Sequence, residues 1–83
     1  MLTRSDLQPG DRLVVTCSTD DGDTEEYAGE VTGIDGHHIR IDPASSIATR
    51  IRVGVDGNGR PRGAEIVTSH RKLTREVERL ELK

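Results

Sequence analysis

The chain contains short runs in which apolar and polar residues alternate, separated by turns rich in glycine, proline and aspartate. Successive side chains of a strand point to opposite faces, so such runs predict β-strands with one buried face. The clearest are residues 12–18 (RLVVTCS), 37–42 (HHIRID) and 49–55 (TRIRVGV), the last two joined by a connection over 43–48. We expect an all-β fold, a small five-stranded antiparallel bent barrel that forms one domain over residues 1–83.

Two further segments complete the predicted sheet. Residues 26–34 (EYAGEVTGI) read as the second strand, and residues 64–69 (AEIVTS) as the fifth. Val31 and Ile34 are three residues apart, so they share a face only if the strand contains a β-bulge, for which Gly33 is well placed. The predicted inward-facing residues of the other strands are Leu13, Val15, Cys17, Ile39, Ile41, Ile51, Val53 and Val55.

Turn signals delimit these strands. Residues 3–8 are expected to form one short helical turn capped by Thr3 or Ser5. Pro9-Gly10-Asp11 predicts a turn before the first strand, and Asp35-Gly36 predicts a hairpin.

The tail fits two periodicities. Its apolar residues are Leu73, Val77, Leu80 and Leu82. The first three have helical spacing, whereas the last two have strand spacing. We expect a helical turn near 70–76 followed by a short strand near 78–82, with a single helix over 70–82 as the alternative.

The composition constrains which side chains can pack the core and which cellular compartment is expected. The chain has no Trp, no Phe and one Tyr, so aliphatic side chains must pack the core, and self-association would hide more apolar surface. Cys17 is the single cysteine, which excludes an internal disulfide and is typical of a reducing compartment. No segment has the apolar length of a signal peptide or a membrane span, so we expect a cytoplasmic protein without membrane contact.

Charge is unevenly distributed along the chain. Residues 1–42 carry ten acidic and three basic residues, a net charge of −7, whereas residues 43–83 carry five and nine, a net charge of +4. Ten of the twelve cations are arginine, and this richness in Asp and Arg is typical of proteins from salt-loving archaea or from GC-rich genomes. A basic second half favours an anionic partner or an acidic protein surface.

The glycine-rich stretch at residues 55–64 (VDGNGRPRGA) has two interpretations. Phosphate-binding loops use glycines at the start of a helix, but the spacing here matches no such motif, and a predicted strand follows. The favoured interpretation is a hairpin loop in which Asp56-Gly57 makes the turn. The other is a loop whose Arg60 and Arg62 contact phosphate or an acidic partner.

A second group of arginines lies on predicted strands. Arg40, Arg50 and Arg52 alternate with inward isoleucines and valines, so they should point outward. If the strands at 37–42 and 49–55 pair, the three arginines share one face, which His38 also joins. One interpretation is that such a stripe follows a phosphate backbone. The other is that the arginines serve solubility and cross-strand ion pairing with Asp42, Asp56 and Glu30.

No constellation for catalysis or metal binding is visible. The acidic loop over 19–25 lacks the order of an EF-hand, and neighbouring His37 and His38 should point to opposite faces of a strand. Cys17 has no adjacent base and reads as a core residue. We therefore expect a protein that is not an enzyme and that has no cofactor and no bound metal.

Residues 13–42 resemble the first motif of Sm-like RNA-binding barrels. The matching positions are Tyr27, Gly29, Val31, Ile34 and Asp35. The resemblance implies a small bent barrel and RNA binding, with His37 at a position where the family often carries a base-stacking ring. The base-reading Asn of that motif would fall at Ile39 and is missing, and Arg62-Gly63 is at most a fragment of the second motif.

The layout from Pro9-Gly10-Asp11 to Val31 is also similar to KOW-type barrels of translation and transcription factors. Their basic loop is acidic here. Both resemblances imply the same small barrel.

These observations favour a non-enzymatic binding module that contacts RNA or DNA phosphates. The candidate binding residues are Arg40, Arg50, Arg52, Arg60, Arg62, His37 and Tyr27. The alternative is a protein-protein interaction or self-associating module, a possible homo-oligomer, that uses an edge strand or the apolar residues of the tail.

Overall fold

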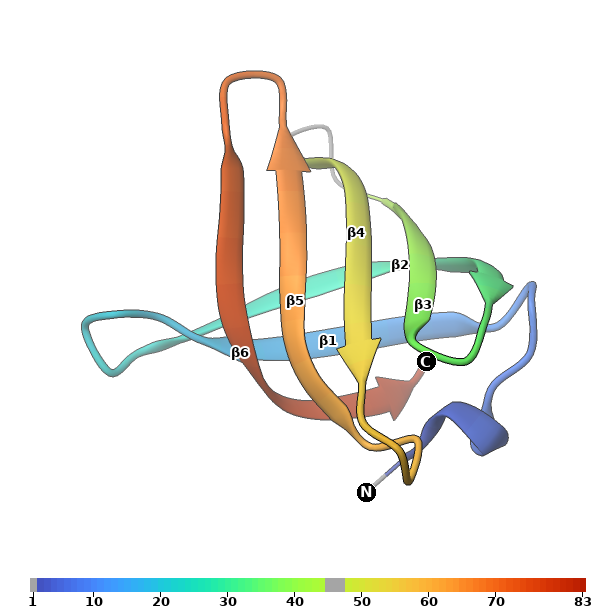
Figure 1. Cartoon of the computed structure of the whole chain (residues 1–83). Helices are drawn as coiled ribbons and strands as arrows, with labels where there is room; N and C mark the ends of the chain where they lie inside the picture. Colours follow the sequence, from blue (N-terminus) through green and yellow to red (C-terminus); the bar gives the residue numbers. More distant parts are fainter. Residues whose placement is uncertain (1, 45–47) are drawn as a thin grey trace.

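The structure, a computed structural model, describes residues 2–44 and 48–83, and these form an all-β closed barrel. The strands in chain order are β1 (Arg12–Ser18), β2 (Thr24–Ile34), β3 (His38–Pro43), β4 (Ala48–Val55), β5 (Pro61–Thr68) and β6 (Lys72–Leu82). Each strand is antiparallel to its neighbours, and β6 pairs with β1 to close the barrel (Figure 1). The predicted small antiparallel barrel is confirmed, with six strands rather than five.

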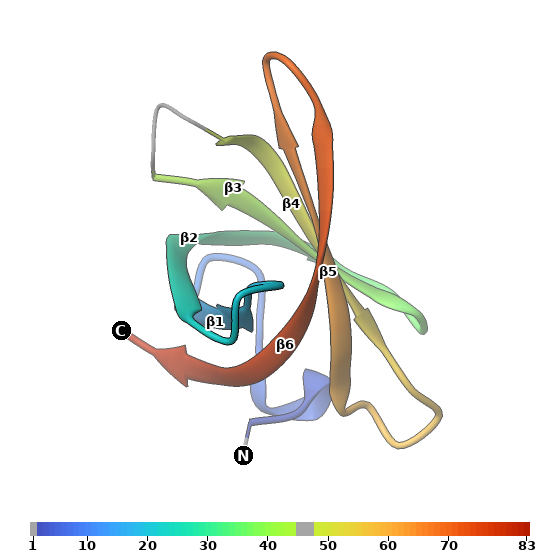
Figure 2. The same cartoon turned by 90° about the vertical axis from the view of Figure 1, so that its left-hand side faces the viewer.

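Two long strands turn the sheet into a barrel. The first half of β2 pairs with β1, and its second half pairs with β3. In the same way β6 pairs with β5 and then bends to run along β1 (Figures 1 and 2). Each of these strands is eleven residues long, so it can serve two neighbours that run in different directions.

A β-bulge occurs at each of these bends. In β2 the register shifts between Val31 and Gly33, as the spacing of the apolar residues predicts. In β6, Val77 lies opposite Cys17 and Arg79 lies opposite Thr16, so Glu78 is the extra residue. Bulges increase strand twist and bending, which closure of a small barrel requires.

Strand β6 occupies the tail from Lys72 to Leu82, so the helical turn predicted near 70–76 and the alternative helix over 70–82 are wrong. The strand predicted near 78–82 is confirmed as part of this longer strand. Leu73, Val77 and Leu80 all pack on the barrel interior, but the bulge at Glu78 changes which positions face inward. The resulting spacing of three between Val77 and Leu80 imitates a helical period. Ser18 Oγ donates a hydrogen bond to the Glu78 carboxylate, which links the bulged residue to β1.

The core is aliphatic, as a chain without Phe and Trp requires. Its largest fully buried side chains include Leu13, Val15, Ile39, Ile51 and Ile66, which are the alternate residues of their strands. All predicted inward residues are buried except Ile34 and Val55, which are partly buried and pack against the core. Cys17 is a free thiol buried in this core, as predicted.

The N-terminal segment covers one end of the barrel. A 3-10 turn, η1 (Arg4–Asp6), begins after Thr3, whose backbone N–H donates to the Asp6 carboxylate at 2.9 Å. Leu7 then enters the core, and Gly10 makes the predicted turn with a φ of 97°. The segment therefore adds apolar burial to a thin core.

The β3–β4 connection is only partly described. Residues 45–47 of the connection predicted over 43–48 lie outside the described residues, while Pro43 belongs to β3 and Ala48 to β4. Within residues 2–44 and 48–83, no helix is long and apolar enough to cross a membrane.

Candidate nucleic-acid interface

Three of the predicted arginines share one outer face of the barrel. Arg40 on β3 lies directly opposite Arg52 on β4, and Arg50 is two residues away on the same strand. The alternation of β4 keeps Arg50 and Arg52 on one side, and both are exposed. Lys72 on β6 adds a cation near Arg52, because both pair with Glu65. These four residues are called the arginine face below.

The guanidinium groups of Arg40 and Arg52 turn away from each other. Arg40 lies across the backbone of Gly33, and its Nη1 is 3.0 Å from Oδ2 of Asp35. Arg52 extends to the other side, where its Nη2 is 2.6 Å from Oε1 of Glu65. Each arginine is thus paired with a carboxylate on the strand or turn that lies beyond it. The partners differ from Asp42, Asp56 and Glu30, which the sequence suggested for cross-strand pairing.

Glu65 lies between two cations. Its other oxygen, Oε2, is 3.4 Å from Nζ of Lys72. The hydrogen bond from Arg52, followed by that from Lys72, lowers the pKa of the Glu65 carboxyl below its ordinary value. The carboxylate is therefore ionised at neutral pH and offsets part of the charge of the face.

A small hollow opens between β4, β5 and β6. It has a volume of about 100 Å³ and is lined by Arg50, Arg52, Lys72, Glu65 and Val67. Three cations and one carboxylate surround it, so its net charge is positive. Arg50 forms no ion pair within the described residues, which leaves its charge available to a ligand.

Asp35 organises the β2–β3 turn beside the face. Its Oδ1 accepts the backbone N–H groups of His37 at 2.8 Å and His38 at 2.7 Å. These two hydrogen bonds, ahead of the charge of Arg40, lower the pKa of the Asp35 carboxyl. The predicted Asp35-Gly36 turn therefore also supplies the acidic partner of Arg40.

His37, Arg60 and Arg62 gather at one end of the barrel, beside the arginine face. The backbone N–H of Val55 donates to the His37 carbonyl at 2.8 Å, which holds the β2–β3 turn against the β4–β5 loop. Arg4 of the N-terminal turn joins them, because its Nη1 donates to the Gly36 carbonyl at 2.8 Å. Strand β3 starts at His38, so this loop end adjoins the face.

The β4–β5 loop is a hairpin loop and not a phosphate cradle. Oδ1 of Asp56 accepts the backbone N–H groups of Asn58 at 2.9 Å and Arg60 at 3.0 Å. Gly59 supplies the positive φ of 78° that closes the turn. The Asp56 carboxylate thus occupies the donors that a bound phosphate would need, and it also lies 3.3 Å from Nε of Arg62. Arg60 makes no ion pair within the described part of the chain.

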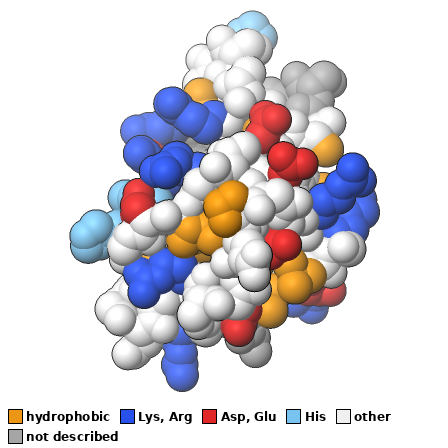
Figure 3. Space-filling view, turned by 90° about the vertical axis from the view of Figure 1, so that its right-hand side faces the viewer, with side chains coloured by type: hydrophobic (Ala, Val, Ile, Leu, Met, Phe, Trp, Pro, Cys, Tyr) orange, Lys and Arg blue, Asp and Glu red, His pale blue; other side chains and the backbone are white. Residues whose placement is uncertain are grey.

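The surface of the β2–β3 side carries mixed charge. Figure 3 shows Lys and Arg side chains in separate groups, with acidic and hydrophobic side chains between them. Lys and Arg side chains therefore do not form a continuous basic surface on this side of the barrel.

Tyr27 lies away from the arginine face. It belongs to the half of β2 that pairs with β1, and its ring packs against the core. Its hydroxyl donates a hydrogen bond to Glu25 at 2.5 Å. Burial, that hydrogen bond and the charge of Glu25 raise the pKa of Tyr27 to about 12. Because its ring packs against the core, Tyr27 is not positioned to stack on a base beside the predicted arginines.

Arg75 is an inward-facing cation that the sequence analysis missed. Its side chain is 18% exposed, and its buried Nε lies 3.8 Å from Oε2 of Glu25 without a hydrogen-bond partner in the described residues. The alternation of Leu73, Arg75 and Val77 is the signal that a strand interpretation of the tail would have used. Burial and the charge of Glu25 raise the pKa of nearby Cys17 to about 11, so the thiol is not an activated nucleophile.

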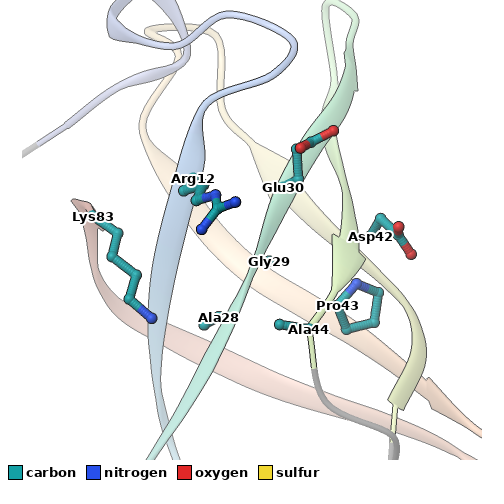
Figure 4. A pocket seen from close by; sticks show the side chains of 8 residues that line it. All are labelled: Arg12, Ala28, Gly29, Glu30, Asp42, Pro43, Ala44 and Lys83. Atoms are coloured by element: carbon teal, nitrogen blue, oxygen red, sulfur yellow. The ribbon is translucent and has the colours of Figure 1, made fainter.

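A second groove lies on the outer side of β2. It has a volume of about 280 Å³, and its lining includes Arg12 and Lys83 together with Glu30 and Asp42 (Figure 4). Its floor at Gly29 is tight, because β2 and β3 approach closely there. Two cations and two carboxylates line this groove, so it has no net positive charge and does not extend the arginine face.

The remaining candidates do not assemble into a site. In residues 2–44 and 48–83, no three His, Cys, Asp or Glu residues are arranged to hold a metal ion. Val77 and Leu80 are buried in the core and Leu73 packs against it, so the predicted apolar surface of the tail does not form. Leu82 is exposed. Every described strand has two neighbours in the closed barrel, which leaves no whole strand as a free edge.

Comparison of the chain with protein-family models, curated proteins and solved structures finds no match.

Proposed function

We propose that this protein is a non-enzymatic binding module that contacts the phosphates of nucleic acid through the arginine face. The observation that carries the proposal is the hollow of about 100 Å³ between Arg50, Arg52 and Lys72. Three cations and Glu65 give this ion-sized space a net positive charge, and its size suits one phosphate group. Arginine suits this task because its planar guanidinium forms paired hydrogen bonds with phosphate oxygens.

The placement of Arg40 opposite Arg52 also supports the proposal. Like charges directly opposite each other on an antiparallel pair destabilise a sheet, so a structural role alone does not favour this arrangement. Asp35 and Glu65 relieve part of this repulsion, and a polyanion on the face would offset the remainder.

The ion pairs of the face do not prevent phosphate contact. The side chains of Arg40, Arg52, Asp35 and Lys72 are between 44% and 62% exposed, and Glu65 is partly exposed. Exposed ion pairs contribute only about 0–1 kcal/mol, so arginines exchange such partners for phosphate at low cost. Arg60 and Arg62 at the adjoining loop end extend the proposed contact. The resemblance of residues 13–42 to Sm-like and KOW-type barrels stays a prediction that agrees with this function.

The test is a fluorescence-anisotropy titration of labelled RNA and DNA with the wild-type protein and two variants, at two salt concentrations. Arg50→Gln removes a cation of the hollow, and Arg79→Gln is the control, because Arg79 is an exposed β6 arginine that pairs with Glu81. We expect Arg50→Gln to weaken binding several-fold and to lower the salt slope by about one. Arg79→Gln should leave both unchanged.

Two outcomes would contradict the proposal. Absence of binding at low salt would exclude a nucleic-acid module and favour a protein partner or self-association. Equal losses in both variants would show attraction by charge alone, without a site at the hollow.

A further inference from the structure

We propose that the ligand of the arginine face is a double-stranded nucleic acid, held by its backbone without contact to unstacked bases. This inference rests on the proposed function and names the ligand class of the same site. It follows from the absence of stacking rings on the face, the size of the hollow and the regular backbone positions of the cationic residues.

None of the four residues of the arginine face carries an aromatic ring on which a base could stack. Proteins that hold single strands stack successive bases on aromatic side chains, which contributes about 1–3 kcal/mol per base. The chain has one Tyr and no Phe or Trp, and Tyr27 lies on the β1–β2 half with its hydroxyl bound to Glu25. The interaction that stabilises most single-strand complexes is therefore missing from this surface.

The two histidines beside the face do not replace such a platform. The rings of His37 and His38 have centroids 6.4 Å apart and an interplanar angle of 68°. They form an edge-to-face pair and not two parallel faces that could enclose a base. Their backbone N–H groups are both held by Asp35, which fixes this part of the turn.

The hollow accepts an ion-sized group and not a base. Its volume is about 100 Å³. Pockets that enclose organic ligands are larger, about 300–1,000 Å³, and are mostly apolar. Arg50, Arg52, Lys72 and Glu65 line most of this hollow, with Val67 as its apolar contact. A phosphate fits these surroundings, whereas a flipped-out base would lack both the space and an apolar wall.

The strands fix the backbone positions from which the cationic side chains extend. Neighbouring strands lie about 4.8 Å apart, and residues two positions apart on a strand are separated by about 6.6 Å. Arg40 and Arg52 occupy adjacent strands, and Arg50 and Arg52 occupy alternate positions of β4. A duplex presents phosphates in a regular array, so cationic side chains that extend from regular backbone positions suit a duplex better than a flexible single strand.

The acidic residues of the face strengthen this preference. Asp35 and Glu65 already neutralise part of the positive charge. The net positive charge of the face is therefore small, and a ligand with a higher density of phosphates is attracted more strongly. Duplex DNA carries one charge per about 1.7 Å of axis, about twice the density of one of its strands, and it releases more counterions per contact.

The test compares a labelled duplex of about 20 base pairs with each of its separate strands, which are chosen to be unstructured, at one low salt concentration. RNA and DNA duplexes form two arms of the experiment, because they share the phosphate chemistry. We expect duplex binding at least about tenfold tighter than that of either strand in one or both arms.

Single strands that bind as tightly as the duplex would overturn the inference while leaving the proposed function intact. Absence of binding to every probe would overturn both. The double variant His37→Ala, His38→Ala supplies a second criterion. It should change duplex affinity less than about twofold, in line with a backbone-only contact. A tenfold loss of single-strand binding in this variant would show that the imidazoles stack on bases and would contradict the inference.

Discussion

Arg40 and Arg52 face each other across β3 and β4, yet their guanidinium groups turn in opposite directions to different carboxylates. Arg40 reaches Asp35 over the backbone of Gly33, and Arg52 reaches Glu65. Because side chains directly opposite on an antiparallel pair are close, this divergence lowers the repulsion between them. The two carboxylates therefore make a cationic face compatible with a stable sheet.

Replacing one of these arginines should separate binding from stability. Arg40→Thr removes both a like-charge contact and a weak exposed ion pair, so the free energy of unfolding should change by less than about 0.5 kcal/mol. Affinity for duplex nucleic acid should fall about threefold or more. Urea denaturation and anisotropy measure the two effects, with Arg79→Thr as the control. A large loss of stability would show that Arg40 serves the fold.

Removing the charge of Glu65 should strengthen binding. Glu65→Gln releases Arg52 and Lys72 from their shared carboxylate, so duplex affinity at low salt should rise several-fold. The gain should shrink at high salt, because screening weakens the added attraction. Weaker binding in this variant would mean that Glu65 positions Arg52 for the ligand and does not compete with it.

The cluster of Tyr27 and Cys17 predicts loss of stability at alkaline pH. Burial is the largest cause that raises the pKa of Cys17 from 9.0 to about 11 and of Tyr27 from 10.0 to about 12. The unfolded chain then releases protons at lower pH than the folded protein, so the stabilisation is complete below pH 9 and is lost between about pH 9 and 12. Absorbance titration of the Tyr27 phenol and urea midpoints across this range test the effect.

The variant Glu25→Gln provides the comparison. It removes a charge that raises both pKa values, so Tyr27 should ionise at lower pH than in the wild type. An unchanged titration would contradict the assigned contact between the Tyr27 hydroxyl and Glu25.

The close approach of β2 and β3 predicts a specific sensitivity at Gly29. A Cβ at this position would lie 2.5 Å from the Asp42 carbonyl oxygen and 2.5 Å from Cγ2 of Ile41. Gly29→Ala should therefore destabilise the protein by about 1–3 kcal/mol. Gly57→Ala is the matched control, because no atom lies within 4 Å of its added Cβ and its φ is not positive. Equal urea midpoints for the two variants would contradict the strand register.

The tail offers a test of the sixth strand. Leu80 is 3% exposed and Leu82 is 51% exposed, although they are two residues apart on β6. Leu80→Ala should cost about 2–5 kcal/mol, whereas Leu82→Ala should cost less than about 0.5 kcal/mol. Thermal unfolding followed by circular dichroism distinguishes them. A reversed order would show that the tail does not pack in this register.

The two bulges show how far periodicity predicts this fold. Val31 and Ile34 break the alternation, and the glycine between them indicates a bulge, which the structure contains. Val77 and Leu80 break it in the same way, but no glycine marks the position of Glu78, and the spacing resembles a helix. The strand state of the tail depends on pairing with β1 and β5, which are distant in sequence.

The candidate site could also be predicted only in part, because some of its features depend on local sequence pattern and others on strand pairing. Strand alternation predicts that Arg40, Arg50 and Arg52 point outward, and their common face follows once β3 pairs with β4. Lys72 joins them only because β6 lies beside β5. Tyr27 leaves the predicted set because its half of β2 pairs with β1 and not with β3. The local sequence pattern predicts the direction of each side chain, whereas strand pairing determines which side chains become neighbours.

The sequence by itself determined the all-β class, the aliphatic core, the turns and the outward direction of the arginines, because these depend on residue type and local spacing. Only the tertiary structure decided that the predicted barrel has six strands and that β6 extends from Lys72 to Leu82. It also decided which carboxylates neutralise which arginines. These features arise from pairing between segments far apart in the chain, where the contacts depend on register and bulges that local spacing does not encode.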